Sequence, residues 1–491
     1  MRRIALVVIL AAAATARLWF LTAGVPHAVG IDEPQVVDRA LRILRTGDWN
    51  PHLFDFPTLV IYFNAVLAIV RFLWGALQGE WRSLDGFSID AIYSTLRFAA
   101  AVIGVVTVWI TYRLGTELVS REVGLFSAAQ LAVRPLHVRE SHFVLTDVPM
   151  TALTTLAIWM TVRAMRLGSV RAYAWAGAAC GFAAAAKYNG GLAIIAVVAA
   201  WVLHERRAAD RGMKLLAAVS AAAGAFLICA PYTILDIPAF LDGFAAQFAR
   251  FASPAAPGTD PGWLVYVKEL SLPWLRFWVP LGVAGIALLL WRPKTRLPAL
   301  SVALFALAYF YVLSTHSVVS GRYALPLVPL LCVFTSVAAL AIVQAFTRLS
   351  ALKRPVWPPV LTGAAVALLT WAAIVDTIGW IEGLKRPDTR TIAADWLKAN
   401  TPKGTRVAVE NSGPTYLDSA GFKVAGVELL LDHPIDFYRS RVDYLVISAA
   451  DLSRYSDYIA AGSVVLQVPT TLQRWGPPIQ VVSLRPLNAA Q

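Results

Sequence analysis

Long apolar runs dominate residues 1–381 and constrain the fold more than any other feature of the sequence. A membrane-spanning helix needs about 20 predominantly apolar residues. Hydrophobic residues make up 58% of the 491 residues and charged residues only 15%, whereas soluble domains have about 45–50% and about 25%. We therefore predict a polytopic α-helical membrane protein. The candidate runs are 4–24, 57–77, 94–114, 122–138, 148–165, 172–186, 190–205, 214–231, 275–291, 298–315, 323–345 and 358–381.

The positions of the basic residues predict how these runs thread the membrane. Short cytoplasmic loops are enriched in Lys and Arg. If 57–77 does not cross, every short basic cluster falls on the cytoplasmic side. These clusters are Arg113 and Arg121; Arg163, Arg166 and Arg171; Arg206 to Lys214; Arg292, Lys294 and Arg296; and Arg348, Lys353 and Arg354. The same placement argues against nucleic-acid binding, because the net charge of +13 forms no continuous stripe.

We accordingly expect about 11 spans, with the N-terminus in the cytoplasm and the C-terminus outside. The first run is longer than a signal-peptide core and no A-x-A cleavage site follows it, so we expect a retained helix. The first external loop, 25–93, is then long. It contains 57–77, expected at the outer interface, and 33–46, whose apolar and charged residues fall on opposite helical faces and predict a surface helix.

The composition changes after residue 381. TIAADWLKANTP predicts a helix that ends before Pro402, while TRVAVEN, DYLVIS, SVVLQVP and IQVVSLRP predict strands. The range 382–491 is thus expected to form a small external α/β domain beside a membrane domain of residues 1–381. It has no Gly-rich nucleotide loop. It also has no convergent acid–base set, so we interpret it as a scaffold or an acceptor-docking module rather than a catalytic one.

Two acidic side chains, Asp32 and Glu33, follow the first span directly. A carboxylate at a helix start is stabilised by the helix dipole, so one interpretation of the pair is a simple N-cap. The other interpretation is an acid–base site, since a carboxylate accepts a proton during nucleophilic attack.

The segment between two expected spans, 134–149, is unusually polar for a short membrane hairpin. It contains His137, Arg139, Glu140, His142 and Asp147. The two histidines and the aspartate are compatible with a metal site, but their spacing matches no metalloenzyme motif. Surface or hydrogen-bonding histidines are the favoured interpretation, and neither a metal nor a cofactor is predicted.

Cations occur at two further positions on the expected external side. Lys187 and Tyr188 lie in the turn KYNGG, where the lysine either snorkels to the interface or binds an anion. Arg322 and Tyr323 open a span in SGRY. A cation at a helix start is disfavoured by the helix dipole, and a phosphate nearby would compensate because a guanidinium binds two of its oxygens.

Carboxylates and cations on one membrane face predict transfer of a group from a lipid phosphate to an acceptor. The carboxylate takes the acceptor's proton and the cations stabilise the departing phosphate. The alternative from another class is a transporter or flippase of lipid-linked glycans. That class often has internal repeats and ionisable residues near the bilayer midplane, and neither is evident in this sequence.

The sequence resembles a known family in several segments. These are GIDEPQVVDRALRILRTGDWNPHLFDFPTLVIY, HVRESHFVLTDVPMT, AAKYNGG, PYTILD and SGRYALPLVP, all within residues 1–381. They resemble the GT-C glycosyltransferases, in particular the bacterial relatives of dolichyl-phosphate-mannose protein mannosyltransferases and of the aminoarabinose lipid A transferase. The first loop lacks the Glu-Lys pair of the latter enzymes, and the chain lacks the luminal repeat domain of the eukaryotic mannosyltransferases.

The resemblance implies an inverting glycosyltransferase of a bacterial cytoplasmic (inner) membrane, acting at its periplasmic face on a polyprenyl-phosphate-linked sugar. It implies that Asp32 is the general base, with Glu33 as its neighbour, and that Asp147 is the second acidic position. Arg322 with Tyr323, Lys187 with Tyr188, and His137 with Arg139 are the expected substrate- and phosphate-binding residues. The acceptor is a lipid, a glycan or a protein.

The threading is tested by reporter fusions. Alkaline phosphatase fused after Asp85 is expected to be active, because that loop is predicted to be external, whereas the same fusion after Ala208 is expected to be inactive. Equal activity of the two fusions would overturn the argument from loop charge.

Overall fold

The computed structural model describes residues 2–205, 208–252, 260–271, 276–348, 357–471 and 474–485. Arg206, Lys353 and Arg354, which entered the charge argument, lie outside the described residues. The chain divides into two compact units, which are described separately. The helical unit comprises Met1–Trp19, Val36–Glu80 and Thr95–Ile378, and the α/β unit comprises Phe20–Gln35, Trp81–Ser94 and Gly379–Gln491.

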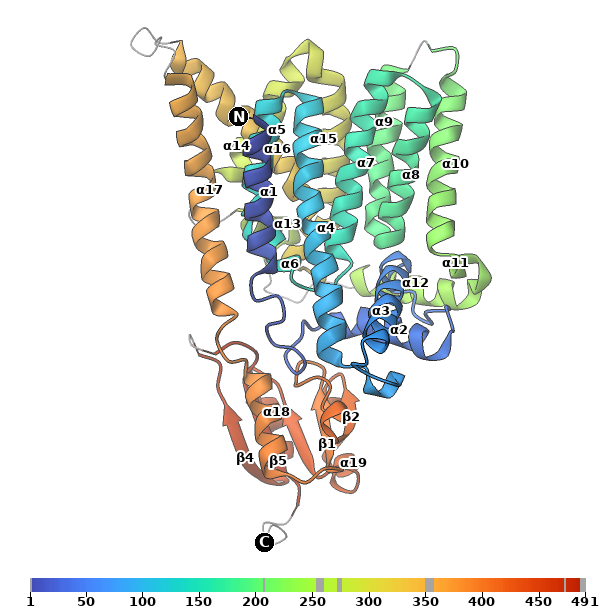
Figure 1. The fold of residues 1–491 in the computed structure, drawn as a ribbon, viewed down its shortest axis with the longest axis vertical. Helices are drawn as coiled ribbons and strands as arrows, with labels where there is room; N and C mark the ends of the chain where they lie inside the picture. The colour runs from blue at the N-terminus through green and yellow to red at the C-terminus, as the bar shows by residue number, and fades with distance from the viewer. Residues whose placement is uncertain are drawn as a thin grey trace. The chain divides into compact units, whose positions relative to one another are not determined.

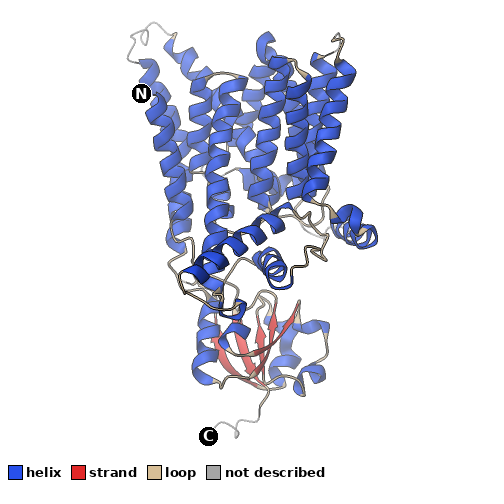
Figure 2. Ribbon diagram, turned by 45° about the vertical axis from the view of Figure 1, so that its right-hand side comes forward, coloured by secondary structure: helices blue, strands red, loops and turns tan. Residues whose placement is uncertain are grey.

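Each of the eleven expected spans coincides with a helix. These helices are α1 (Arg2–Leu18), α4 (Ile89–Leu118), α5 (Arg121–Ala132), α7 (Asp147–Leu167), α8 (Val170–Ala186), α9 (Ile194–His204), α10 (Arg211–Cys229), α14 (Trp278–Trp291), α15 (Pro293–Ser314), α16 (Leu327–Thr347) and α17 (Trp357–Gly383). They run side by side as a bundle (Figures 1 and 2). Of the helices in the described ranges, seven are long and apolar enough to cross a membrane, and one of these is α3 (Leu59–Leu77). The number of spans stays a prediction.

Helices other than these eleven gather at one end of the bundle. Figure 1 shows α2 (Glu33–Thr46), α3 and α12 (Ile237–Ala252) there. The prediction of a helix over 33–46 is confirmed, and Val36, Val37 and Ala40 on its apolar face are at most 2% exposed. The sequence did not predict α12 or its neighbours. The remaining elements of this unit are α6 (Pro135–Glu140), η2 (Tyr188–Ala193), α11 (Tyr232–Leu235), α13 (Gly262–Leu270) and η3 (Gly321–Ala324).

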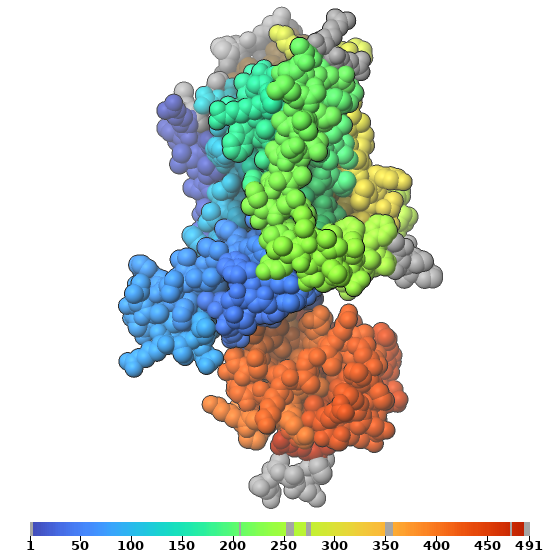
Figure 3. Space-filling view, turned by 90° about the vertical axis from the view of Figure 1, so that its right-hand side faces the viewer, coloured from blue at the N-terminus to red at the C-terminus, as the bar shows by residue number. Residues whose placement is uncertain are grey.

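The loop between α2 and α3 packs against α11 and α12. In Figure 3 its blue surface adjoins the green surface of those helices. Asn50 Nδ2 donates to Asp236 Oδ2 at 2.8 Å, and Thr58 Oγ1 donates to the Cys229 carbonyl at 2.6 Å. Phe54 meets Phe240 edge to face at 6.0 Å between ring centroids. The first loop is therefore anchored on the segment that follows α10.

Small residues allow α8 and α10 to approach closely. Lipid supplies little hydrophobic drive between spans, so association depends on packing and on residues that let backbones touch. A Cβ on Gly177 would overlap the Ala218 carbonyl, and one on Gly181 would overlap that of Ala222. The two glycines are four residues apart on one face of α8, in the small-xxx-small arrangement of membrane helix pairs.

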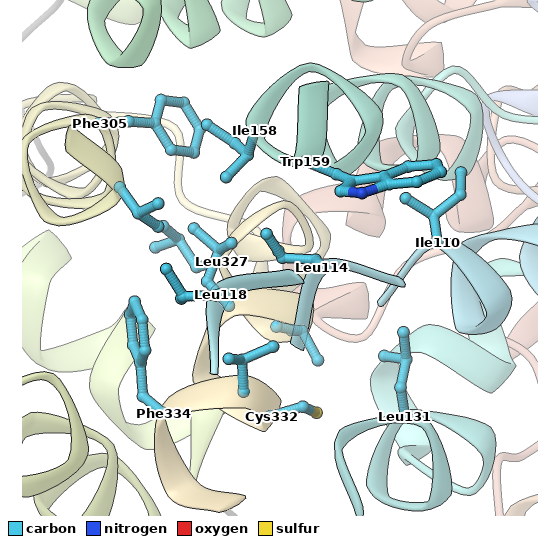
Figure 4. Close-up of a cluster of buried hydrophobic side chains, with 14 of the residues drawn as sticks. Ile110, Leu114, Leu118, Leu131, Ile158, Trp159, Phe305, Leu327, Cys332 and Phe334 are labelled. Atoms are coloured by element: carbon cyan, nitrogen blue, oxygen red, sulfur yellow. The ribbon is translucent and has the colours of Figure 1, made fainter. Parts of the chain in front are cut away.

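The centre of the bundle combines an apolar core with one polar network. Figure 4 shows the side chains of Ile110, Leu114, Leu131 and Phe334 among this core, drawn from α4, α5 and α16. Within it, the Gln130 amide accepts from Trp278 Nε1 at 3.0 Å and donates to Ser336 Oγ at 2.9 Å. Satisfied polar groups of this kind link helices in a medium without water.

The α/β unit is built on a five-stranded sheet with order β2-β1-β3-β5-β4. The strands are β1 (Arg406–Glu410), β2 (Lys423–Val427), β3 (Tyr444–Ile447), β4 (Ser463–Val468) and β5 (Ile479–Ser483); β1 is parallel to β2 and β3, and β5 is antiparallel to β3 and β4. The helix α18 (Thr389–Asn400) packs on one face, and α19 (Ile435–Arg439) and α20 (Ser456–Ala460) pack on the other. Short 3-10 turns complete the unit: η1 (Leu84–Gly86), η5 (Asp418–Ala420), η6 (Leu430–Asp432) and η7 (Leu452–Tyr455).

The sequence predicted α18 and four of these strands, and the structure confirms them. It missed β2, an edge strand with four of its five residues exposed. Such a strand lacks the alternation of apolar and polar residues that identifies a half-buried strand.

The start of the first loop is an integral part of the α/β unit. Arg390 donates to the Val29 carbonyl at 2.8 Å and to the Ala28 carbonyl at 3.3 Å. Its guanidinium is held in turn by both carboxylate oxygens of Asp388, each at 2.9 Å. Thr415 N donates to the His27 carbonyl at 3.0 Å. Residues 27–29 are therefore fixed by the C-terminal domain.

The contact between α8 and α10 predicts a specific sensitivity to side-chain size. Gly177→Ala is expected to lower the stability of the protein by about 1–3 kcal/mol, the usual cost of overpacking. Gly224→Ala on α10 is the matched control, since a Cβ there meets open space. Thermal unfolding in detergent measures both variants, and equal midpoints would contradict the proposed role of Gly177.

Candidate functional site

An ion pair joins two of the predicted residues, Asp147 and Lys187. Asp147 is the first residue of α7, where the helix dipole favours a carboxylate, and Lys187 follows the last residue of α8. Lys187 Nζ donates to Asp147 Oδ1 at 2.7 Å, and the two side chains are 19% and 3% exposed. Removing one partner of a pair buried to this degree costs about 3–5 kcal/mol, because the other charge is left uncompensated.

The turn after α8 is shaped by the glycines of KYNGG. Gly190 N donates to the Lys187 carbonyl at 2.8 Å, and Lys187 N donates to the Ala183 carbonyl at 3.1 Å. A Cβ on Gly190 would overlap the same Ala183 carbonyl. The tight turn of η2 thus needs a glycine, and it directs Lys187 toward the start of α7.

An aromatic ring lies beside the Lys187 ammonium. The Nζ atom is 4.6 Å from the ring centroid of Tyr323, and Arg322 Cζ is 5.6 Å from the same ring. Both distances allow a cation–π interaction. Tyr309 Oη donates to the Tyr323 carbonyl at 3.0 Å and holds η3 in place. Two cations from different turns therefore meet at one tyrosine.

A second carboxylate, Glu140, completes the cluster. It is 5% exposed and accepts from Arg139 Nε at 2.8 Å. Burial raises the pKa of Glu140, while Arg139 opposes this shift; Asp147 raises the pKa further and Arg322 lowers it. The pKa of Glu140 thus depends on the charges of both Asp147 and Arg322, which lie on separate elements.

His316 lies near Lys187. Its ring meets that of Phe251 in a tilted arrangement at 4.6 Å between centroids, and Phe251 meets Tyr323 edge to face at 6.0 Å. Burial lowers the pKa of His316, and the positive charge of Lys187 lowers it further. The histidine is therefore expected to be neutral at pH 7.

His137 contacts a different set of residues. It is fully buried, and its Nδ1 lies 3.0 Å from Arg17 Nη2, which makes the ring nitrogen the acceptor. Arg17 also donates to the carbonyls of Ala13, Ala132 and Leu131. This network joins α1 to the break between α5 and α6.

Tyr188 is adjacent to the cluster in sequence but contacts a different set of residues. Its hydroxyl donates to the Phe54 carbonyl at 3.1 Å, and its ring meets Phe244 edge to face at 5.3 Å. Tyr188 thereby connects the KYNGG turn to the first loop and to α12.

The first-loop acids, Asp32 and Glu33, belong to the α/β unit and differ from each other in setting. Glu33 is 0% exposed and its Oε2 accepts from Gly30 N at 2.7 Å, within the turn that precedes α2. Asp32 precedes the helix and is partly exposed. Glu33 is therefore engaged within this turn, and Asp32 is the more accessible carboxylate.

The helical unit thus brings together Asp147, Lys187, Arg322 and Tyr323, with Arg139 adjacent through Glu140. Glu140, Tyr309 and Phe251 were not predicted as site residues from the sequence. Only Glu140 had a detectable signal, the density of charge in segment 134–149. In the described ranges, no three His, Cys, Asp or Glu side chains are grouped so that they would hold a metal ion.

Comparison with known proteins places this geometry in context. Residues 86–234 match a family model described as dolichyl-phosphate-mannose-protein mannosyltransferase. That range contains Asp147 and Lys187. No curated protein matches the sequence.

The fold is shared with solved membrane enzymes. ArnT from Cupriavidus metallidurans, solved bound to undecaprenyl phosphate, has 17% identity and a TM-score of 0.62, and the match covers 98% of each chain. The archaeal oligosaccharyltransferase AglB from Archaeoglobus fulgidus, solved with an inhibitory peptide and a dolichol-phosphate, has 14% identity and a TM-score of 0.61. The match covers 91% of this chain and 69% of the AglB chain.

The chain therefore has the fold of these membrane enzymes, and within it residues 86–234 match the mannosyltransferase family model.

Proposed function

We propose that the protein transfers a sugar from a polyprenyl-phosphate donor to an acceptor at the external face of a bacterial cytoplasmic membrane, with inversion at the transferred carbon. The observation that carries this proposal is the meeting of Lys187 and Arg322 at Tyr323, beside the ion-paired Asp147. ArnT, which has the same fold, was solved with undecaprenyl phosphate bound, and that ligand is the phosphate-bearing part of such a donor.

The two cations suit a phosphate. An ammonium has three N–H donors, and one of those of Lys187 is engaged by Asp147. The other two are available to phosphate oxygens, and Arg322 adds a planar guanidinium that binds two oxygens at once. In this assignment Asp147 orients Lys187, and Tyr323 holds both cations against its ring.

The transfer is a single displacement. The acceptor O–H or N–H attacks the anomeric carbon while the bond from that carbon to the phosphate oxygen breaks, which inverts the configuration. The acceptor's proton passes to the Asp32 carboxylate, acting as general base. The charge that develops on the departing polyprenyl phosphate is stabilised by Lys187 and Arg322. Glu33 supports the loop through its hydrogen bond to Gly30.

The assignment of Asp32 predicts a large and selective loss of transfer. Asp32→Asn removes the base but keeps the shape, and general bases contribute about 10²–10⁴-fold to rate. The measurement is transfer of radiolabel from polyprenyl-phosphate sugars in membranes. Asp38→Asn, on the exposed face of α2, is the matched control and should retain activity. Wild-type transfer by Asp32→Asn would show that another group is the base.

Because Lys187 and Asp147 form an ion pair, we expect the effects of substituting them on donor binding to be non-additive. Lys187→Met is expected to weaken donor binding, raising the KM for the donor about tenfold or more, because a charge-assisted bond to phosphate is lost. If Asp147 acts by orienting Lys187, adding Asp147→Asn to Lys187→Met should cause little further loss.

Independent, multiplicative losses from these two substitutions would instead assign Asp147 a role of its own. The control is Lys268→Met, which breaks an exposed ion pair of similar length, 2.6 Å to Asp260. It should leave the donor KM unchanged.

A further inference from the structure

A hollow of about 470 Å³ lies within the α/β unit, beside the C-terminal end of α18. Its lining joins two distant parts of the chain. His27 comes from the start of the first loop, Lys398 and Thr401 come from the end of α18, and Lys403, Ser419 and Phe422 come from the turns around β1 and β2. The volume is in the range of small-molecule sites.

The wall that contains His27 is fixed. His27 is 4% exposed, and its Nδ1 lies 2.8 Å from the Thr415 carbonyl. A carbonyl only accepts, so Nδ1 carries the proton. Thr415 Oγ1 donates to the Pro26 carbonyl at 2.6 Å, and Thr415 N donates to that of His27 at 3.0 Å. The hollow is therefore preformed on this side, which lowers the entropic cost of binding.

The hollow is positively charged. Lys398 contacts Asp395 at 3.3 Å, with both side chains well exposed, and an exposed pair of this kind is weak. Lys403 forms no ion pair with any residue that the structure describes. Burial lowers the pKa of His27, and the charge of Lys398 lowers it further although the Thr415 carbonyl opposes both. The two lysines are thus the charges available to a ligand.

The hydroxyls of the hollow favour a ligand that donates hydrogen bonds. Thr401 Oγ1 donates to the Leu397 carbonyl at 2.7 Å, and Ser419 Oγ donates to the Tyr416 carbonyl at 2.7 Å. Their hydrogens are engaged, so each oxygen presents lone pairs and accepts from a ligand O–H. Phe422 supplies an apolar surface. Inorganic phosphate has few O–H groups to donate to these two oxygens, whereas a hydroxyl-rich anion would use both sets of groups fully.

We propose that this hollow binds a sugar that carries an anionic group, a phosphate or a carboxylate, and that this sugar is part of the acceptor. The lysines bind the anion, and Thr401 and Ser419 accept from the sugar hydroxyls. Only the naming of the sugar as acceptor rests on the proposed function. His27 lies five residues before Asp32 in the same unit, so a ligand in the hollow contacts the chain segment that continues to the proposed base.

Binding to the full-length protein in nanodiscs is the direct test, with glucose 6-phosphate, glucuronate, glucose and inorganic phosphate as probes. Both anionic sugars are expected to bind saturably and more tightly than glucose or phosphate. The double substitution Lys398→Gln/Lys403→Gln should weaken their binding about tenfold or more. Lys385→Gln is the matched control, because Lys385 is exposed, pairs with Glu382 and does not line the hollow.

Three results would overturn the proposal: no saturable binding of either anionic sugar, binding that the double substitution does not change, or phosphate binding as tight as that of glucose 6-phosphate. If a glycolipid with a sugar-phosphate headgroup in the nanodisc competes with the probe, the acceptor is borne by a lipid. If it does not compete, the acceptor is soluble. Asp32→Asn should abolish transfer and retain binding, so failure of the hollow and failure of the proposed transferase are distinguishable.

Discussion

The hydrocarbon core of a membrane solvates neither charges nor free backbone groups, and the arrangement of polar residues in the helical unit follows from this constraint. The polar groups of the cluster lie where helices break: between α5 and α7, between α8 and η2, and at η3 before α16. At those breaks the chain can present lysine, arginine and carboxylates without placing them in mid-span. Inside the spans, polar groups such as Gln130 are engaged with partners on neighbouring helices.

A buried cation shows how one such break is maintained. The guanidinium of Arg17 binds three carbonyls and the ring of His137, and it is fully buried. The carbonyls of Leu131 and Ala132 come from the last turn of α5, where four carbonyls lack partners within the helix. Arg17 supplies these donors, and the chain then continues into α6, which carries Glu140. An arginine on the first span thus supports the turn that contributes a carboxylate to the cluster.

Much of the fold was predictable because it follows from periodicity and loop charge. The helices of the eleven expected spans, the surface helix over 33–46, α18 and four strands were all indicated by local patterns of apolar residues. The strand β2 lacked such a pattern, since an exposed edge strand buries too little to impose a period. Pairings were the least predictable feature. Asp147 and Lys187 were each selected, but their contact depends on the packing of α7 against α8, and the partnership of His137 with Arg17 spans 120 residues.

The hydrogen bonds from Arg390 and Thr415 to residues 27–29 have a consequence for how such enzymes diversify. The α/β unit is not one contiguous stretch of sequence. It includes the segment Phe20–Gln35, which the Arg390 side chain contacts across a separation of 361 residues. A recombination event that replaced only the C-terminal region would separate that piece from the side chains that hold it. Exchange of this domain between homologues is therefore expected to require inheritance of residues 20–35 along with it, so the two regions evolve as a single block.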